Sequence, residues 1–192
     1  KVEKKDWMIF AALAFFQPFA YFIGENYGIV YTDATTTSVV ISTIPLFSPV
    51  AAYFFLKERI KPINILGIII SIAGVVLVIL KDDMVFSVDP IGLLLLFGAV
   101  LSAVFYSVVV LKLSGRYNIY SITVWQNFIG IFMFLPVFLI FDLSGFLTAG
   151  FQFIPFMYIS LLAIFGSTIC FLFFIYGVKK LGITRANIFG NS

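Results

Sequence analysis

One carboxylate lies inside a long apolar run of this chain. Glu25 follows Gln17 and Tyr21 at the i, i+4, i+8 spacing of one helix face, within the mostly hydrophobic residues 7–31. If this run crosses a membrane, a carboxylate at mid-bilayer costs roughly 2.5–3.5 kcal/mol on insertion scales, which favours a position facing a cavity or a partner. Glu25 is then a candidate for binding a proton or an amine, with Asn26 beside it as a hydrogen-bonding companion. An interfacial carboxylate is the alternative, because Glu25 falls in the outer third of the run.

The other apolar runs also carry small or polar residues on one face. Such stripes face neighbouring helices or an internal cavity, because small residues let helix backbones approach closely in lipid. For the stripe of Asn64, Gly67, Ser71 and Gly74 we expect tight packing, whereas the bulkier polar stripes also suit a wet cavity. The candidate substrate-binding residues are Gln17, Tyr21, Glu25, Asn26, Ser42, Pro45, Ser102, Tyr106, Trp125, Gln126 and Ser167.

Prolines and deep aromatic rings add to the case for a cavity. A proline interrupts helical hydrogen bonding and bends its helix, and transporters use such interrupted helices to expose backbone groups to substrate. Ser42 and Pro45 belong to a segment in which polarity and prolines coincide. Tyr106 and Trp125 could stack on a planar or apolar substrate, and packing against lipid or other helices is the alternative for either ring. The prolines expected to interrupt spans are Pro18, Pro45, Pro49 and Pro136.

The residues that the chain lacks exclude several chemistries. It has no histidine, which excludes His-based metal sites, His general bases and Ser-His triads. It has no G-x-x-x-x-G-K-[ST] loop, and so no Walker motif for ATP hydrolysis. Its single cysteine, Cys170, lies in an apolar run, where we expect a small side chain buried in the membrane and no internal disulfide. We predict no metal site, no cofactor and no enzymatic activity.

Six long apolar segments position these residues. About 20 predominantly apolar residues cross a bilayer as a helix, and backbone polar groups in lipid must be satisfied internally. The segments lack the strict alternation of barrel strands, and the connections between them are short. We therefore predict an all-α, polytopic membrane helix bundle. The predicted spans are Trp7–Tyr31, Thr35–Leu56, Ile63–Leu80, Ile91–Leu113, Ile119–Phe141 and Phe153–Val178.

The distribution of positive charge orients these crossings. Eleven of the twelve Lys and Arg residues fall in alternate gaps between or beside the segments, and Lys81 is the exception. Loops rich in Lys and Arg tend to remain cytoplasmic, which predicts a multi-pass protein of the plasma (inner) membrane with both ends of this chain in the cytoplasm. Because 62% of the residues are hydrophobic and 11% are charged, the net charge of +3 reflects topology rather than a nucleic-acid partner.

The chain also contains a weak internal repeat. The two copies lie in the first and sixth spans, five crossings apart, so they run in opposite directions. Inverted-topology repeats are typical of transporters. An offset of 149 positions aligns Phe22 with Phe171, Tyr27–Gly28 with Tyr176–Gly177 and Thr35 with Thr184.

Several short motifs carry a family resemblance. They are Tyr27–Gly28 through Thr32, the Pro45–Leu46–Phe47–Ser48–Pro49 run followed by Leu56–Lys57–Glu58–Arg59, Gly67 to Leu77, and, in the second half, Gly92, the Tyr106 region, Gln126, Gly130, Pro136 and Tyr176–Gly177. With them the chain resembles the EamA-like branch of the drug/metabolite transporter superfamily. The resemblance implies ten helices in two inverted five-helix repeats. The chain would then be an internal piece holding helices three to about nine, with residues 1–82 ending the first repeat and residues 83–192 starting the second.

The resemblance also implies a function. It indicates a secondary transporter that exports amino acids or related small metabolites by alternating access, with a small-molecule substrate and the lipid bilayer as its partners. Glu25 matches no general motif of the family, so its place as the proton-coupling candidate rests on this sequence alone. A membrane-embedded enzyme and a non-transporting membrane scaffold are the alternatives, and the enzyme would need clustered Asp, Glu or His at a membrane face. No motif specifies the substrate or the oligomeric state.

Overall fold

The structure is an all-helical bundle. The computed structural model describes residues 2–57, 60, 62–79 and 89–190, and these ranges contain no strand. Short 3₁₀ or π-helical segments, η1 (Lys4–Asp6), η2 (Phe15–Ala20), η3 (Phe138–Asp142) and η4 (Leu162–Ile169), extend or join the α-helices. The α-helices are α1 (Trp7–Ala14), α2 (Tyr21–Tyr31), α3 (Ala34–Ile41), α4 (Ile44–Leu56), α5 (Pro62–Ile79), α6 (Pro90–Ser114), α7 (Ile119–Val137), α8 (Leu143–Ala149), α9 (Phe153–Leu161), α10 (Cys170–Leu181) and α11 (Ile183–Gly190).

Within the described ranges, five helical stretches are long and apolar enough to cross a membrane, and each corresponds to a predicted span. The remaining prediction, Ile63–Leu80, forms α5, whose apolar part Pro62–Leu77 is shorter than the others. Leu80, Lys81 and the predicted boundary between residues 82 and 83 lie outside the described residues. The chain is therefore a multi-pass membrane protein. The five stretches are Lys4–Tyr31, Ala34–Phe55, Pro90–Ser114, Ile119–Ala149 and Phe153–Leu181.

Prolines break two of these stretches. Gln17 has a non-helical backbone (φ −150°, ψ 124°), and the bond between Gln17 and Pro18 is a cis peptide. The second stretch breaks at Ser42 and Thr43, and Pro45 then occupies the first turn of α4, where a missing N–H is tolerated. These breaks agree with the interruptions predicted from Pro18 and Pro45. Pro49 and Pro136, in contrast, lie inside α4 and α7.

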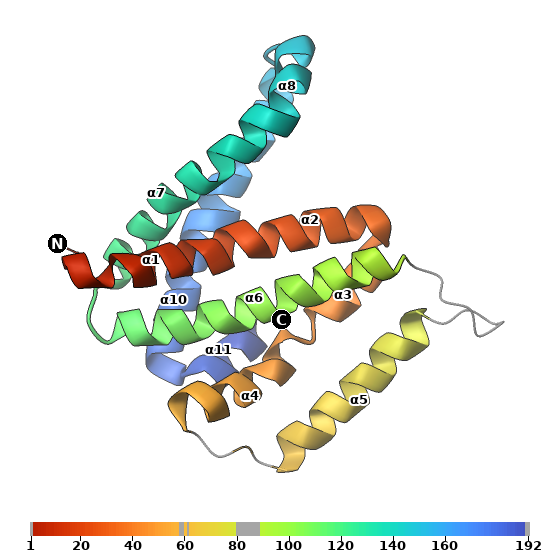
Figure 1. Ribbon diagram of the computed structural model, residues 1–192, viewed down its shortest axis with the longest axis vertical. Coiled ribbons are helices and arrows are strands. Elements are labelled where there is room, and N and C mark those ends of the chain that lie inside the picture. Colours follow the sequence, from red (N-terminus) through yellow and green to blue (C-terminus); the bar gives the residue numbers. More distant parts are fainter. Residues whose placement is uncertain (1, 58–59, 61, 80–88, 191–192) are drawn as a thin grey trace.

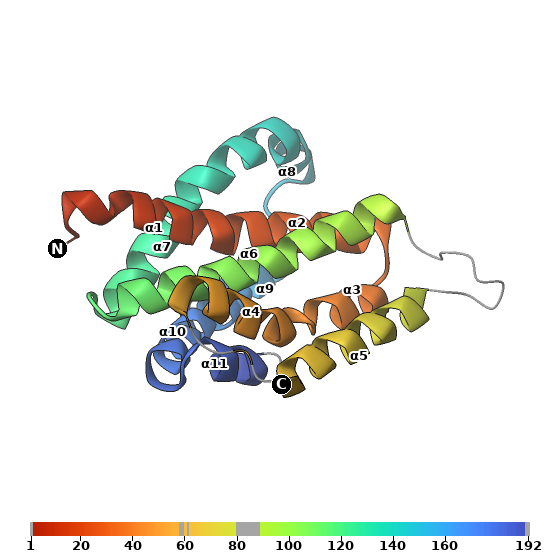
Figure 2. The same ribbon diagram turned by 60° about the horizontal axis from the view of Figure 1, so that its bottom comes forward.

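Helix α6 is the central helix of the bundle. It contacts α1, α2, α3, α4, α10 and α11, and its inward face is fully buried at Leu96, Val100 and Val110. The rod formed by α1, η2 and α2 lies along α6 and runs in the opposite direction (Figures 1 and 2). Gly24 and Gly28 on α2 are buried where the two helices approach each other.

Helix α5 packs much more loosely than the sequence suggests. A methyl group built on Gly74 would meet no atom within 4 Å, and one built on Gly67 would approach Leu46 Cδ2 to 3.3 Å. Ile63, Ile69 and Ile70 are exposed, since α5 lies at the edge of the bundle beside α3 and α4 (Figure 1). The tight packing predicted for the Gly/Ser stripe is therefore wrong at Gly74. Among the glycines of the described residues, Gly24 and Gly28 of α2 and Gly92 of α6 lie at close helix contacts instead.

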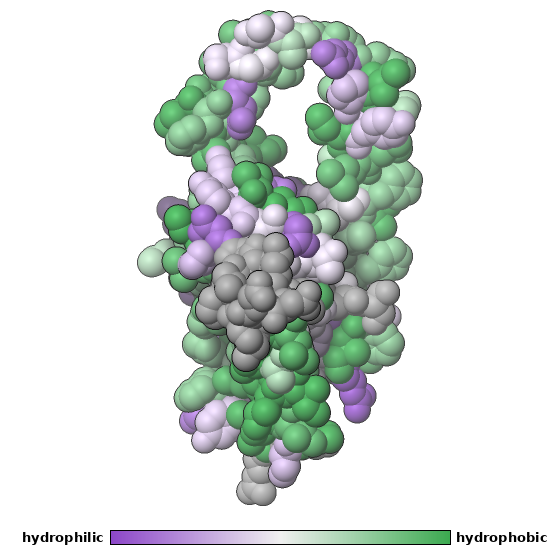
Figure 3. Space-filling model, turned by 90° about the vertical axis from the view of Figure 1, so that its right-hand side faces the viewer, coloured by the Kyte–Doolittle hydropathy of each residue, from purple (hydrophilic) through white to green (hydrophobic). Residues whose placement is uncertain are grey.

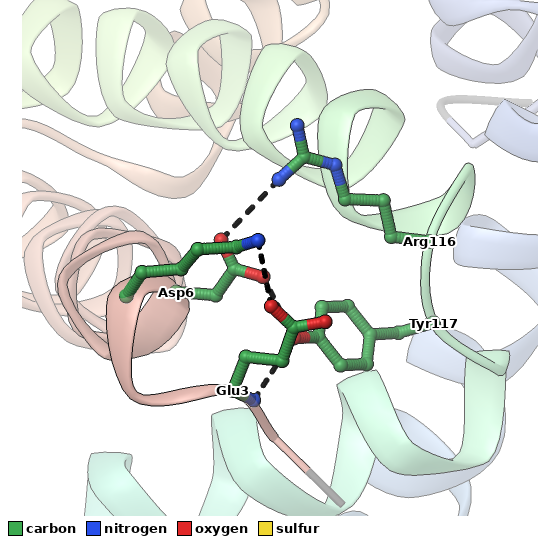
Figure 4. Close-up of polar contacts among 5 residues, drawn as sticks. Glu3, Asp6, Arg116 and Tyr117 are labelled. Carbon is green, nitrogen blue, oxygen red and sulfur yellow. Dashed lines mark hydrogen bonds and ion pairs between the residues drawn. The ribbon is translucent and has the colours of Figure 1, made fainter.

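A polar cluster ties the start of the first stretch to the turn between α6 and α7. Figure 4 shows Asp6 between Arg116 and Tyr117. The Tyr117 hydroxyl donates to Asp6 Oδ2 at 2.7 Å and accepts from the Glu3 backbone N–H at 3.1 Å. An Arg116 nitrogen lies 3.4 Å from Asp6 Oδ1, and Asp6 is 3% exposed. Arg116 also lines a surface depression with Lys179 and Lys180. Three of the basic gaps therefore lie at one end of the molecule, as the alternate-gap pattern predicts.

We expect Tyr117→Phe to destabilise the fold measurably, because it removes two hydrogen bonds and leaves Asp6 with Arg116 alone. The midpoint of thermal unfolding in detergent measures the effect. Tyr120→Phe is the matched control, since the Tyr120 side chain is 63% exposed and makes no hydrogen bond with the described residues. Equal midpoints for the two variants would show that the cluster contributes nothing to stability.

The segment from η3 to η4 projects from the bundle as an apolar hairpin. Figure 3 shows its predominantly hydrophobic surface, and an open space separates its two arms at the top of the molecule. Ile140, Leu147, Phe153 and Leu162 are all more than 60% exposed, which suits contact with lipid or with other protein segments. The connection expected between the predicted spans Ile119–Phe141 and Phe153–Val178 is partly helical, because α8 forms inside it. Gly150, with φ +66°, ends that helix.

Candidate substrate cavity

A cavity of about 540 Å³ lies between the first stretch, α6 and the C-terminal helices α10 and α11. Its volume falls in the usual range for small-molecule sites. Four of the sequence-predicted residues line it, namely Gln17, Tyr21, Glu25 and Tyr106. The full lining is Gln17, Tyr21, Phe22, Glu25, Ile44, Ala103, Tyr106, Gly166, Cys170, Phe171, Phe173, Phe174, Gly177, Leu181, Ala186, Asn187, Phe189 and Gly190. We refer to it as the central cavity.

Glu25 and Tyr21 form the charged corner of the central cavity. Both lie on α2 one helical turn apart, so their side chains meet on one face. The Tyr21 hydroxyl donates to Glu25 Oε1 at 3.0 Å. Glu25 is half-buried, and Gln17 joins the same corner from the break between α1 and α2. The i, i+4, i+8 stripe of the first stretch thus faces a cavity despite the break.

Tyr106 and Gln126 connect the cavity wall to α7. Both residues are completely buried, and the Tyr106 hydroxyl donates to Gln126 Oε1 at 3.1 Å. Gln126 Nε2 has no hydrogen-bond partner among the described residues. The Tyr106 ring stacks on Phe174 with centroids 5.7 Å apart and an interplanar angle of 23°. Gln126 therefore positions a cavity residue from behind and does not itself line the cavity.

Asn187 is a polar lining residue that the sequence analysis missed. Its Nδ2 donates to Ser107 Oγ at 3.0 Å and to the Ile183 carbonyl at 3.1 Å. The signal available was polarity alone, because residues 183–192 contain two asparagines, Asn187 and Asn191. That segment does form a helix, α11, and packs it on α4 and α10.

Two candidates on the first two stretches lie away from the cavity. Asn26 is exposed on α2, and Glu25 takes its hydrogen bond from Tyr21 instead. Ser42 is exposed at the break between α3 and α4, where its hydroxyl donates to the Val39 carbonyl at 2.7 Å.

The other four candidates do not line the cavity, although three of them adjoin a lining residue in the sequence. Pro45 is half-buried next to Ile44, and Ser102 next to Ala103. Trp125 packs edge-on against Trp7 with ring centroids 4.8 Å apart. Ser167 is half-buried on η4, next to Gly166. The structure therefore brings together the polar residues of the first stretch with Tyr106, and leaves these four outside.

Cys170 lines the central cavity and is exposed, with a free thiol. Cys170 also lies inside the apolar stretch Phe153–Leu181, as the expectation of a membrane-buried side chain requires. The described residues contain no cluster of three or more Cys, Asp or Glu side chains that could hold a metal ion.

The apolar stretches, the inward polar stripe and the cavity define a polytopic membrane protein with an internal, partly polar cavity. The chain belongs to the EamA-like transporter family, whose model matches residues 1–80 and 90–192. This confirms the family resemblance drawn from the sequence.

The relatives are transporters of bacteria and archaea. "Uncharacterized transporter YetK" of Bacillus subtilis (strain 168) is 25% identical over 191 residues, 98% of this chain and 58% of the relative. "Uncharacterized transporter YcxC" of the same organism is 28% identical over 157 residues, covering 81% and 50%. An "Uncharacterized transporter" of Archaeoglobus fulgidus is 30% identical over 139 residues, covering 71% and 49%. The chain thus spans about half the length of these relatives. No solved structure matches it.

Proposed function

We infer that this protein is a secondary transporter that exports amino acids or related small metabolites across the plasma membrane by alternating access. The observation that carries the proposal is the central cavity, which is lined by a carboxylate, two amides and two tyrosines within an otherwise apolar bundle. Polar groups in lipid are costly and usually line substrate or ion pathways. Membership of a transporter family supports the same function.

The topology proposed from the sequence accompanies this function. Residues 1–82 would end one five-helix repeat and residues 83–192 would start an inverted second repeat, with both ends of the chain in the cytoplasm. Two contacts support the grouping of the Lys- and Arg-rich gaps on one side of the membrane. Asp6 contacts Arg116, and Arg116 lines the same depression as Lys179 and Lys180. Inverted repeats that rock about a fixed central site would provide alternating access.

Glu25 is the proposed proton-coupling residue. It is the one carboxylate among the described residues that line the cavity. The other titratable groups there are the hydroxyls of Tyr21 and Tyr106 and the thiol of Cys170. Of these, Tyr21 contacts Glu25 directly. A carboxylate that can reach the cavity can exchange protons with it, whereas the two tyrosine hydroxyls are held in hydrogen bonds.

Flux measurements test the proposed function. The intact protein is reconstituted into proteoliposomes that are loaded with a panel of amino acids and related metabolites, and efflux is followed with and without a pH gradient. We expect efflux of at least one compound well above that of protein-free liposomes. Absence of flux with every compound, from protein that is folded and inserted, would contradict a transporter function.

A further inference from the structure

We propose that the central cavity takes organic amines that carry an apolar or aromatic body and no carboxylate. The proposal rests on the proposed transport function and, of the two substrate classes named there, selects related small metabolites over amino acids. Glu25 is the one charged side chain among the described lining residues, and none of these is Lys or Arg. A positively charged group is therefore the complement of this site, because opposite charges in a low-dielectric cavity attract strongly.

The hydrogen-bond donors of the cavity are largely used within the protein. The Tyr21 hydroxyl donates to Glu25, and the Tyr106 hydroxyl donates to Gln126. The Asn187 amide N–H groups donate to Ser107 and to the Ile183 carbonyl. Of the polar side chains in the described lining, this leaves the Gln17 amide as the remaining neutral donor. The acceptors, in contrast, include a carboxylate, which has about four lone-pair sites. An ammonium group brings three N–H donors and no acceptor, so it fits this distribution.

The rest of the wall is aromatic. Phe22, Phe171, Phe173, Phe174 and Phe189 line the cavity together with the Tyr106 ring, which stacks on Phe174. Such a wall buries an apolar or aromatic body, and ring faces also attract an ammonium group. The charged corner and the aromatic wall together match an amphipathic amine.

An amino acid fits the same cavity less well. Its ammonium can bind Glu25, but its carboxylate then lies close to a second carboxylate and finds no Lys or Arg among the described lining residues. Like charges at short range repel, and an unpaired charge in an apolar site carries a desolvation cost. The product of amino-acid decarboxylation keeps the ammonium and the side chain and loses the group that does not fit.

Three compounds with one ring and different charges test the proposal. They are 2-phenylethylamine (a cation), phenylalanine (a zwitterion) and 3-phenylpropionate (an anion). Each is titrated against the rate at which a maleimide labels Cys170, the cavity thiol, in the intact detergent-solubilised protein, and Cys170→Ser gives the background. We expect 2-phenylethylamine to protect Cys170 at a concentration about tenfold or more below that of phenylalanine, with no protection by 3-phenylpropionate. Equal or better protection by phenylalanine or 3-phenylpropionate, or no protection by any of the three, would overturn the proposal.

Variants locate the binding group. Glu25→Gln should raise the protecting concentration of 2-phenylethylamine about tenfold or more, because it replaces a charged hydrogen bond by a neutral one. Asp33→Asn, which changes an exposed carboxylate outside the cavity, should leave that concentration unchanged. Efflux of the same three compounds from proteoliposomes separates the two proposals. Selective amine protection without flux would contradict transport alone, whereas efflux of phenylalanine without amine selectivity would contradict the substrate class alone.

Discussion

Glu25→Gln is expected to remove the pH dependence of transport while the protein remains folded. Glutamine has nearly the shape of glutamate, and its side-chain oxygen can still accept the hydrogen bond that Tyr21 donates to Glu25. The glutamine side chain cannot bind or release a proton in the pH range of the assay. A rate governed by one titrating carboxylate changes by up to about tenfold per pH unit on the steep limb of its profile. The variant should show a flat profile, measured as efflux from proteoliposomes at a series of pH values.

Asp33→Asn is the matched control for this experiment. Hydrogen bonds from Thr36 hold the pKa of the Asp33 carboxyl below its usual value, so Asp33 stays ionised throughout the neutral range. Asparagine is as good an N-cap as aspartate, and the start of α3 should remain intact. The pH profile of Asp33→Asn should therefore match that of the unmodified protein. If Glu25→Gln keeps the same pH profile as well, Glu25 is an interfacial carboxylate and does not couple protons.

The helices and their breaks could be predicted because their causes are local in the sequence. Backbone groups in lipid must be satisfied within each segment, so a long apolar run such as Ile91–Leu113 becomes a helix whatever surrounds it, and α6 confirms this. The same holds for Pro18, which has no N–H to donate and so interrupts the first stretch. The packing of α5 and the course of the chain through residues 142–152 depend on neighbouring segments, and there the prediction was less accurate.

The lining residues that could be singled out from the sequence lie on the first stretch, together with Tyr106 on α6. The polar residues of that stretch share one helix face, so one orientation of the helix brings Tyr21 and Glu25 together. Adjacent residues differ by about 100° around a helix, and for this reason Asn26 faces away although it follows Glu25. Whether a stripe faces a cavity or a neighbour is decided by the packing of whole helices. Among 25 phenylalanines, nothing local distinguishes Phe171 and Phe174, which line the cavity.

The α2–α6 contact holds the charged corner beside the aromatic wall, because α2 carries Glu25 and α6 carries Tyr106. Two glycines one turn apart make this contact possible. A methyl group on Gly24 would lie 2.7 Å from the Leu95 carbonyl oxygen, and one on Gly28 would lie 2.5 Å from Leu96 Cδ2. The Gly24 contact tolerates an added methyl group less well than the Gly28 contact, because it involves a backbone atom. A side chain can change its rotamer to make room, and a backbone carbonyl cannot.

Gly24→Ala should therefore force α2 away from α6. Overpacking of this kind costs about 1–3 kcal/mol, whereas replacing glycine by alanine inside a helix contributes up to about 1 kcal/mol in the opposite direction. Gly98→Ala, on α6 itself, isolates the second effect, because a methyl group there would meet nothing within 4 Å. We expect Gly24→Ala to lower the midpoint of thermal unfolding in detergent, and Gly98→Ala to leave it unchanged or raise it slightly.

The Gly24→Ala variant should also bind 2-phenylethylamine more weakly, since Glu25 moves with α2. The concentration of 2-phenylethylamine that half-protects Cys170 from labelling should therefore rise. If the two alanine variants unfold at the same temperature, α2 and α6 can move apart without loss of stability, and the close contact at Gly24 is not required.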